Sequence, residues 1–148
     1  MNFEHSVTGL DGLINRLAQL SNPEHVNSVV KSALLKGGVL VQATAKLNCH
    51  VDTGQLRNSI EVTELENGVD IGTNVPQAIF EEYGTGRQGD TAVPHTAKER
   101  WRYQDEDGNW HTTSGHPPHP FLYPALQVHK QNIKDEVKNA VVNDLKGR

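Results

Sequence analysis

The sequence predicts an α+β fold in which a small antiparallel sheet of hairpins packs against two long helices, with a protruding loop or hairpin. Apolar residues recur at steps of three and four over residues 23–47 and 121–146, as in amphipathic helices. Between them, residues 56–73 alternate in polarity around Asn67-Gly68, a strong hairpin signal. The predicted order is helix, helix, hairpin, short helix, hairpin or loop, helix, which is typical of α+β domains.

Length and composition limit the classes of protein that this chain can represent. Its 148 residues fit one domain, 1–148, with an insertion-like loop or hairpin at about 85–116. The net charge of −4 excludes a DNA-coating protein, which would carry an excess of Lys and Arg. Cys49 is the only cysteine, which excludes an intrachain disulfide and fits a reducing cytosol. Because we find no signal peptide and no apolar run of the roughly 20 residues that a membrane span needs, we expect a soluble protein made in a cytoplasm.

The first two predicted helices meet at a clear break. The long helix starts after Ser21 or Asn22, either of which can cap it, and Pro23 suits its first turn. Inside this helix, Gly37-Gly38 predicts a kink or close packing against a strand, and a functional hinge is the alternative. The preceding helix, residues 9–20, carries a single apolar stripe formed by Leu10, Leu13, Ile14, Leu17 and Leu20.

A turn and a hairpin follow the long helix. The tripeptide Asp52-Thr53-Gly54 predicts a tight turn in which the glycine takes a positive φ. The strands are predicted at residues 56–64 and 68–73, and Val69 and Ile71 share a face of the second strand. In the first strand, four side chains are expected on one face: Leu56, Asn58, Ile60 and Val62.

Three further elements complete the prediction. Pro76 opens a short helix over residues 77–83, and Gly84 ends it. A second hairpin, with Asp107-Gly108 at its tip, has Trp101 and Tyr103 on one strand and Trp110 on the other. The closing helix runs over residues 121–146, with Pro124 in its first turn and Gly147 at its end.

Asp52-Thr53-Gly54 is also the one tripeptide of a catalytic type. It matches the Asp-Thr-Gly of retroviral-type aspartic proteases, in which each of two chains supplies one aspartate. That protease fold is almost entirely β, whereas a long helical pattern precedes this tripeptide and another ends the chain. We therefore favour the turn, and we keep a dimeric aspartic-type protease as a less favoured alternative.

The histidines and acidic residues give weaker signals. His111, His116 and His119 cluster in the sequence near His95, but His116 and His119 lie in an extended proline segment, and the histidines lack metal-type spacing. We therefore expect no metal and favour solvent or interface positions, including a pH-sensitive contact. Adjacent residues of a helix point in different directions, so Glu81-Glu82 is no acid/base dyad; one of them should cap a helix or pair with an arginine.

No cofactor and no catalytic residue is predicted. Gly84-Thr85-Gly86 lacks the strand and the Gly-Lys-Ser/Thr ending of a phosphate loop. Cys49 next to His50 is best explained as a small, half-buried residue at a helix end.

Aromatic residues in the polar, glycine-rich segment predict a contact surface. Arg100 and Arg102 between aromatics resemble a nucleic-acid signal, but the acidic residues 105–107 would repel phosphate. An interface with neighbouring subunits or partners is favoured. The candidate interface residues are Tyr83, Gly84, Thr85, Gly86, Trp101, Tyr103 and Trp110.

Three segments, taken in order, resemble the head–tail joining proteins of tailed bacteriophages, also called tail-completion or neck proteins. They are VDTGQLRNSI (Val51 to Ile60), AIFEEYGTG (Ala78 to Gly86) and PPHPFLYPAL (Pro117 to Leu126). The resemblance covers residues 5–146, and the stretch 87–115 departs from the family in its length. The structural residues of these motifs are Asp52, Thr53, Gly54, Leu56, Arg57, Pro120, Phe121, Leu122, Pro124, Ala125 and Leu126.

The resemblance implies a structural virion protein of a siphophage or prophage, without catalysis. Such proteins form a homo-oligomeric ring, often sixfold, with a monomer in isolation as the other option. The implied partners are the tail-tube protein and the head connector or adaptor, and DNA passes through the ring without specific binding. The implied location is the virion neck, and the host cytoplasm before assembly. A stand-alone bacterial binding module is the alternative.

Overall fold

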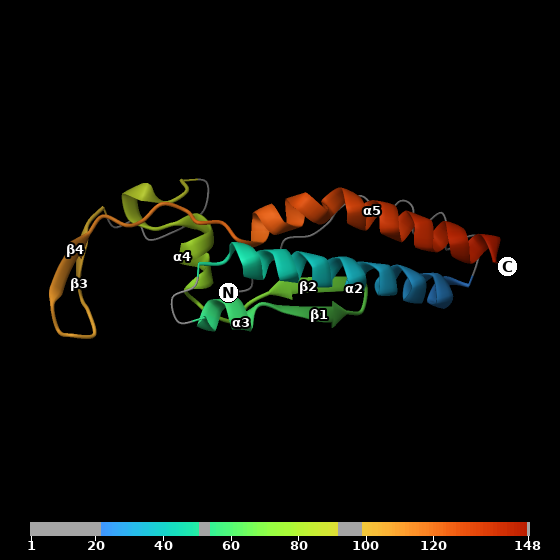
Figure 1. Cartoon of the computed structure of the whole chain (residues 1–148), viewed down its shortest axis with the longest axis horizontal. Helices are drawn as coiled ribbons and strands as arrows, with labels where there is room; N and C mark the ends of the chain where they lie inside the picture. Colours follow the sequence, from blue (N-terminus) through green and yellow to red (C-terminus); the bar gives the residue numbers. More distant parts are fainter. Residues whose placement is uncertain (1–21, 51–53, 92–98, 148) are drawn as a thin grey trace.

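The computed structural model describes residues 22–50, 54–91 and 99–147. Two long helices, α2 (Pro23–Asn48) and α5 (Leu122–Lys146), run antiparallel side by side, and a hairpin of β1 and β2 lies along α2 (Figure 1). A second hairpin, β3 and β4, lies at the far end of the molecule from the C-terminus. The predicted α+β class is confirmed. The predicted helix at 9–20 lies outside the described residues, as do Asp52 and Thr53.

Helix α2 begins as its sequence predicts. The Asn22 side chain accepts a hydrogen bond from the Glu24 backbone N–H at 3.1 Å, and Pro23 occupies the first turn, where no intrahelical donor is needed. The helix ends at Asn48, and the N–H of the following residue, Cys49, donates to the Ala45 carbonyl at 2.9 Å.

The two glycines of α2 allow its neighbours to come close on two sides. A Cβ at Gly37 would lie 2.6 Å from Cγ1 of Ile133 on α5, and a Cβ at Gly38 would lie 3.0 Å from Cγ1 of Val69 on β2. The helix runs through both glycines without interruption. Close packing against a strand is therefore confirmed for Gly38, and Gly37 gives the same access to a helix.

We predict that Gly37→Ala destabilises the fold through Ile133. The added methyl overpacks the helix interface, which costs about 1–3 kcal/mol, and the helix propensity of alanine returns about 1 kcal/mol. In an Ile133→Ala background the clashing atoms are gone, so the same change should become stabilising. Urea unfolding of the parent, the two single variants and the double variant measures this coupling.

Additive effects of the two changes would contradict this account. Gly68→Ala is the matched control, because a Cβ there meets no atom within 4 Å.

The first hairpin forms where it is predicted. Strands β1 (Glu61–Leu65) and β2 (Gly68–Gly72) pair antiparallel from Glu61↔Gly72 to Leu65↔Gly68, with residues 66–67 as the turn. Val69 and Ile71 share the face that meets Gly38 of α2. Helix α2 therefore lies between α5 on one side and the hairpin on the other (Figure 1).

The predicted start of the first strand at residue 56 is wrong. Residues Gln55–Ser59 form a short helix, α3, which follows Gly54 in the left-handed region at φ 78°, so the positive φ predicted for this glycine is confirmed. The Asn58 N–H donates to the Gly54 carbonyl at 2.9 Å. The predicted alternation failed because Leu56 and Ile60 are also four residues apart, a spacing that a helical turn buries equally well.

The core lies mainly between α2 and α5. At one end of the pair, His25 Nε2 lies 2.7 Å from Asp144 Oδ1, and further along Thr44 Oγ1 lies 2.7 Å from His129 Nε2. None of the described helices combines the length and the apolarity that a membrane span requires. The buried apolar residues of the core are Val26, Val30, Ala33, Val41, Ala45, Cys49, Ile60, Ala78, Phe121, Leu122, Ala125, Leu126, Ile133, Val137 and Val141.

Candidate functional site

A buried carboxylate joins helix α4 (Ala78–Tyr83) to the start of α5. Glu82 is 3% exposed; its Oε2 accepts from the backbone N–H groups of Phe121 (2.9 Å) and Leu122 (3.0 Å), and its Oε1 accepts from that of Tyr123 (2.8 Å). The first N–H groups of a helix have no intrahelical acceptor and lie at the positive end of its dipole. The prediction that one residue of Glu81-Glu82 caps a helix is thus confirmed, over a separation of about forty residues.

The chain after α4 pairs with the segment that precedes α5. The N–H of Thr85 donates to the His116 carbonyl (2.9 Å), and the N–H of Arg87 donates to the Ser114 carbonyl (3.0 Å). Beside them, the N–H of His119 donates to the Glu81 carbonyl (2.7 Å). These bonds hold residues 81–87 alongside residues 114–119, the segment that leads into the N-terminus of α5.

This pairing buries three residues of the predicted interface. Gly84, Thr85 and Gly86 are all buried, and a Cβ at Gly84 would lie 2.6 Å from the His116 carbonyl oxygen. The other member before the second hairpin, Tyr83, is half-buried, and burial, followed by the charges of Glu82 and Asp90, raises its pKa. Their assignment to an interface stays a prediction.

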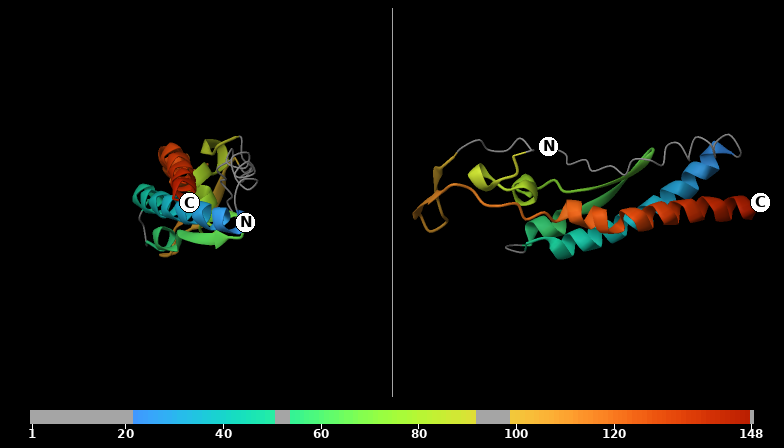
Figure 2. Two further views of the ribbon diagram at one scale, coloured as in Figure 1. Left: turned by 90° about the vertical axis from the view of Figure 1, so that its right-hand side faces the viewer. Right: turned by 90° about the horizontal axis from the view of Figure 1, so that it is seen from above.

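The second hairpin, which we call the arm, comprises residues 101–113. Strands β3 (Trp101–Gln104) and β4 (Trp110–Thr113) pair antiparallel, from Trp101↔Thr113 to Gln104↔Trp110. Gly108 has a φ of 85° at the tip, as the Asp-Gly signal predicts. The arm projects away from the long helices, and its strands contact chiefly each other (Figures 1 and 2).

The three aromatic residues of the arm have different surroundings. Trp101 is half-buried, and its ring lies 2.9 Å from where a Cβ at Gly86 would be, so it ties the arm to the rest of the chain. Tyr103 is 48% exposed and stacks on His111, with ring centroids 5.4 Å apart. Trp110 is 61% exposed on the opposite face, where the Arg102 guanidinium lies 5.2 Å from its ring centroid. Tyr103 and Trp110 are therefore the arm aromatics available to a partner.

A hydrogen bond between a histidine and an aspartate closes the tip of the arm. His111 Nε2 lies 2.7 Å from Asp105 Oδ2, and this hydrogen bond, followed by the one that the Asn109 backbone N–H donates, lowers the pKa of Asp105. A lowered pKa in the folded arm means that the carboxylate stabilises the arm above the ordinary aspartate pKa. That stabilisation is lost as the pH falls through the lowered value.

We predict that His111→Ala raises the pKa of Asp105 towards its ordinary value, because the largest cause of the shift is removed. The carboxyl carbon of Asp105, followed by NMR through an acid titration, measures this. His116→Ala, which changes a histidine away from the tip, should leave the titration unchanged. An unmoved titration in His111→Ala would contradict the role of the pair.

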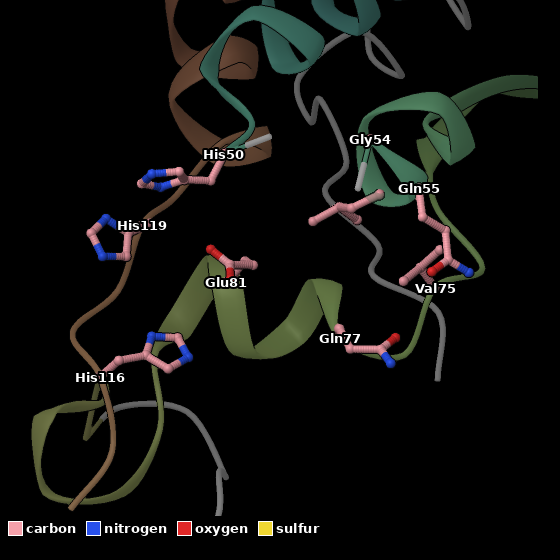
Figure 3. Close-up of a pocket in the computed structure, with 9 residues that line it drawn as sticks. His50, Gly54, Gln55, Val75, Gln77, Glu81, His116 and His119 are labelled. Atoms are coloured by element: carbon pink, nitrogen blue, oxygen red, sulfur yellow. The ribbon is translucent and has the colours of Figure 1, made fainter. Parts of the chain in front are cut away.

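A hollow of about 570 Å³ lies between the end of α2, α3, α4 and the segment before α5. His119 lies between His50 and His116, with ring centroids 5.4 and 6.3 Å away, and Glu81 on α4 points towards them (Figure 3). In the described part of the chain, no group of three or more His, Cys, Asp or Glu side chains is placed to hold a metal ion. The histidines make this hollow a polar surface.

The predicted histidine cluster is only partly assembled. His111 lies on the arm, hydrogen-bonded to Asp105, whereas His116 and His119 join His50, which sequence reasoning did not connect with them. No sequence signal marks this meeting, because His50 follows α2 and the others precede α5. His95 lies outside the described residues.

Cys49 has a structural environment. It is 5% exposed, and burial, followed by the negative charge of Glu81, raises its pKa, while Arg57 acts in the opposite direction. A raised pKa keeps the sulfur as the neutral, weakly nucleophilic thiol. Cys49 is more buried than the half-buried residue that the sequence predicts, and it belongs to the core.

The described residues of the family motifs divide into buried and exposed positions. Leu56 packs against the core from α3, whereas Arg57 and Pro120 are exposed, and Pro124 is half-buried in the first turn of α5. The chain before Asp52 forms α2 and the chain after Gly54 forms α3, so helices flank the Asp-Thr-Gly tripeptide on both sides. The motif residues that join the core from the start of α5 are Phe121, Leu122, Ala125 and Leu126.

Comparison with known proteins gives one match. Residues 11–84, half of the chain, match the family model described as "Bacteriophage HK97-gp10, putative tail-component". No curated protein and no solved structure matches significantly. The match contains the Val51 to Ile60 motif and runs to Gly84 in the second motif; the arm and the Pro117 to Leu126 motif lie beyond it.

Proposed function

This chain belongs to the HK97-gp10-like family of bacteriophage tail components, and from this premise we propose that it joins head and tail as a neck or tail-completion protein. Its role as a structural, tail-related virion protein follows from the family. The proposal adds a homo-oligomeric ring, a hexamer in the virion, between the head connector or adaptor and the tail tube. DNA passes through this ring, and no catalysis is involved.

The observation that best supports the proposal is that the arm projects from the molecule and exposes aromatic side chains. A two-stranded hairpin alone is at best marginally stable in water, and this one is attached by Trp101 while it exposes Tyr103 and Trp110. Aromatic residues in such positions are enriched in the cores of protein interfaces. A ring needs two different surfaces on each subunit, because its contacts are heterologous, and a projecting arm supplies one of them.

The charge of the chain supports a passive role towards DNA. With a net charge of −4, a ring of copies would not attract phosphate as a basic lumen does. The proposal therefore predicts a channel that lets DNA slide.

A shortened arm tests the proposal. Residues 102–112 would be replaced by a Gly-Ser turn in the phage or prophage that encodes the chain. Separate filled heads and tails should accumulate, while the purified variant keeps the helical circular dichroism and melting temperature of the parent. Joined particles at the parental level would exclude a role of the arm in head–tail joining. Absence of the chain from purified virions would favour the stand-alone binding module.

A further inference from the structure

The outward face of α2 carries an apolar patch that no described element covers. Val39, Leu40 and Leu47 are 50%, 51% and 78% exposed, and Ala43, also exposed, lies within one helical turn of all three. Helix α5 meets α2 at Gly37 and Thr44, and the first hairpin meets it at Gly38. These contacts leave the four exposed residues, which we call the α2 patch, facing away from both neighbours.

Two lysines of α2 lie beside the α2 patch. After Glu24, helix α2 carries Lys31, Lys36 and Lys46 and no acidic residue. Lys31 is paired with Glu64 at 3.1 Å, whereas Lys36 and Lys46 flank the patch along the helix. The patch therefore presents an apolar centre with a basic rim.

The arm has the complementary character. It exposes Trp110, over whose ring the Arg102 guanidinium lies, and its tip carries Glu106 and Asp107 in exposed positions. An aromatic anchor in an apolar pocket supplies binding energy, and opposite charges around it set the orientation. In one chain the arm points away from α2, so the two surfaces cannot meet within a single copy in this conformation (Figure 2).

From this complementarity we infer that the arm of one copy docks on the α2 patch of a second copy. The inference rests on the proposed ring, for which it supplies the two different surfaces of a heterologous contact. Trp110 lies on the patch, and Glu106 and Asp107 lie near Lys36 and Lys46 of the neighbour.

Photo-crosslinking in assembled particles tests the contact directly. p-Benzoylphenylalanine at position 112, an exposed position on the same face of the arm as Trp110, should give in the full chain an adduct of twice the chain mass, joined to a peptide within residues 36–47. The same probe at Val142, 37% exposed on α5, is the control and should give no such adduct. An adduct with a different virion protein, or with another part of a second copy, would overturn the inference.

Charge exchange provides an independent test. Glu106→Lys with Asp107→Lys should lower the adduct yield about tenfold, as should Lys36→Glu with Lys46→Glu, since tenfold corresponds to about 1.4 kcal/mol of contact energy. Combining all four changes restores opposite charges and should restore the adduct. Lys134→Glu with Lys138→Glu on α5 matches the lysine change in charge and should have no effect. If the variant with all four changes gives no higher adduct yield than the two double variants, the inference is overturned.

Head–tail joining is scored in the same particles, so the two proposals can fail separately. Joined particles that yield adducts with another protein would leave the proposed function standing without this contact. The opposite result is also possible. If two copies crosslink within residues 36–47, but loss of the chain leaves head–tail joining unaffected, the contact is supported and the proposed function is excluded.

Discussion

Replacing Glu82 with alanine should lower the free energy of unfolding by about 3 kcal/mol, because three backbone N–H groups at the start of α5 lose their acceptor. Two of these bonds are buried, so water cannot replace the carboxylate without opening the packing around Phe121 and Leu122. Urea unfolding followed by circular dichroism measures the change. We expect Glu82→Gln to fall between the parent and the alanine variant, since the amide keeps one acceptor oxygen.

Glu81→Ala is the matched control for this prediction. It removes the same side chain from the neighbouring position of α4, where Glu81 is half-exposed at the hollow, and should cost less than about 0.5 kcal/mol. If the two alanine variants were equally stable, the capping role of Glu82 would be excluded.

Replacing Gly115 with alanine should have the second largest effect, by separating the base of the arm from the chain after α4. Gly115 has a φ of 104°, and a Cβ there would collide with the Thr85 carbonyl oxygen. The left-handed backbone costs an alanine about 1–3 kcal/mol, and the collision with main-chain atoms adds to this. Amide hydrogen exchange at Thr85 and Arg87, whose N–H groups bond to residues 116 and 114, should become faster.

Gly108→Ala distinguishes the cost of left-handed backbone strain from the cost of the steric collision. Gly108 also has a positive φ, 85°, but a Cβ there would meet only the Gln104 side chain, at 3.6 Å. We therefore expect a smaller loss that is confined to the tip of the arm. Equal effects of the two alanine variants on exchange at Thr85 would show that backbone strain, rather than the collision, sets the cost.

Glu82 and Gly115 act on the same connection between the core and the arm. The carboxylate holds α4 to α5, and the glycine lets residues 81–87 lie against the segment that leads out of the arm. Both changes should therefore weaken head–tail joining indirectly, with loss of stability, whereas changes at Trp110 or at the α2 patch should weaken it while the fold stays stable.

Local patterns in the sequence predict much of the architecture. The period of apolar residues placed α2 and α5, Asn67-Gly68 and Asp107-Gly108 marked the two hairpins, and Pro23 and Gly84 marked helix ends. These features can be predicted because their causes lie within a few residues: side-chain period, capping donors and the φ that glycine permits. The three motifs also led to the phage family that the match over residues 11–84 shows.

Contacts between distant segments decided the rest. The start of α5 determines that Glu82, and not Glu81, is buried. His50 meets His119 because α2 ends beside the segment that precedes α5. Leu56 and Ile60 suit a strand or a helical turn equally well, and packing on α2 selected the turn. The sequence alone thus determined the two long helices, the two hairpin turns and the family, because these depend on local periodicity and motif order. The tertiary structure alone decided which polar groups are buried and which aromatics stay exposed, because burial depends on neighbours that the local sequence does not specify.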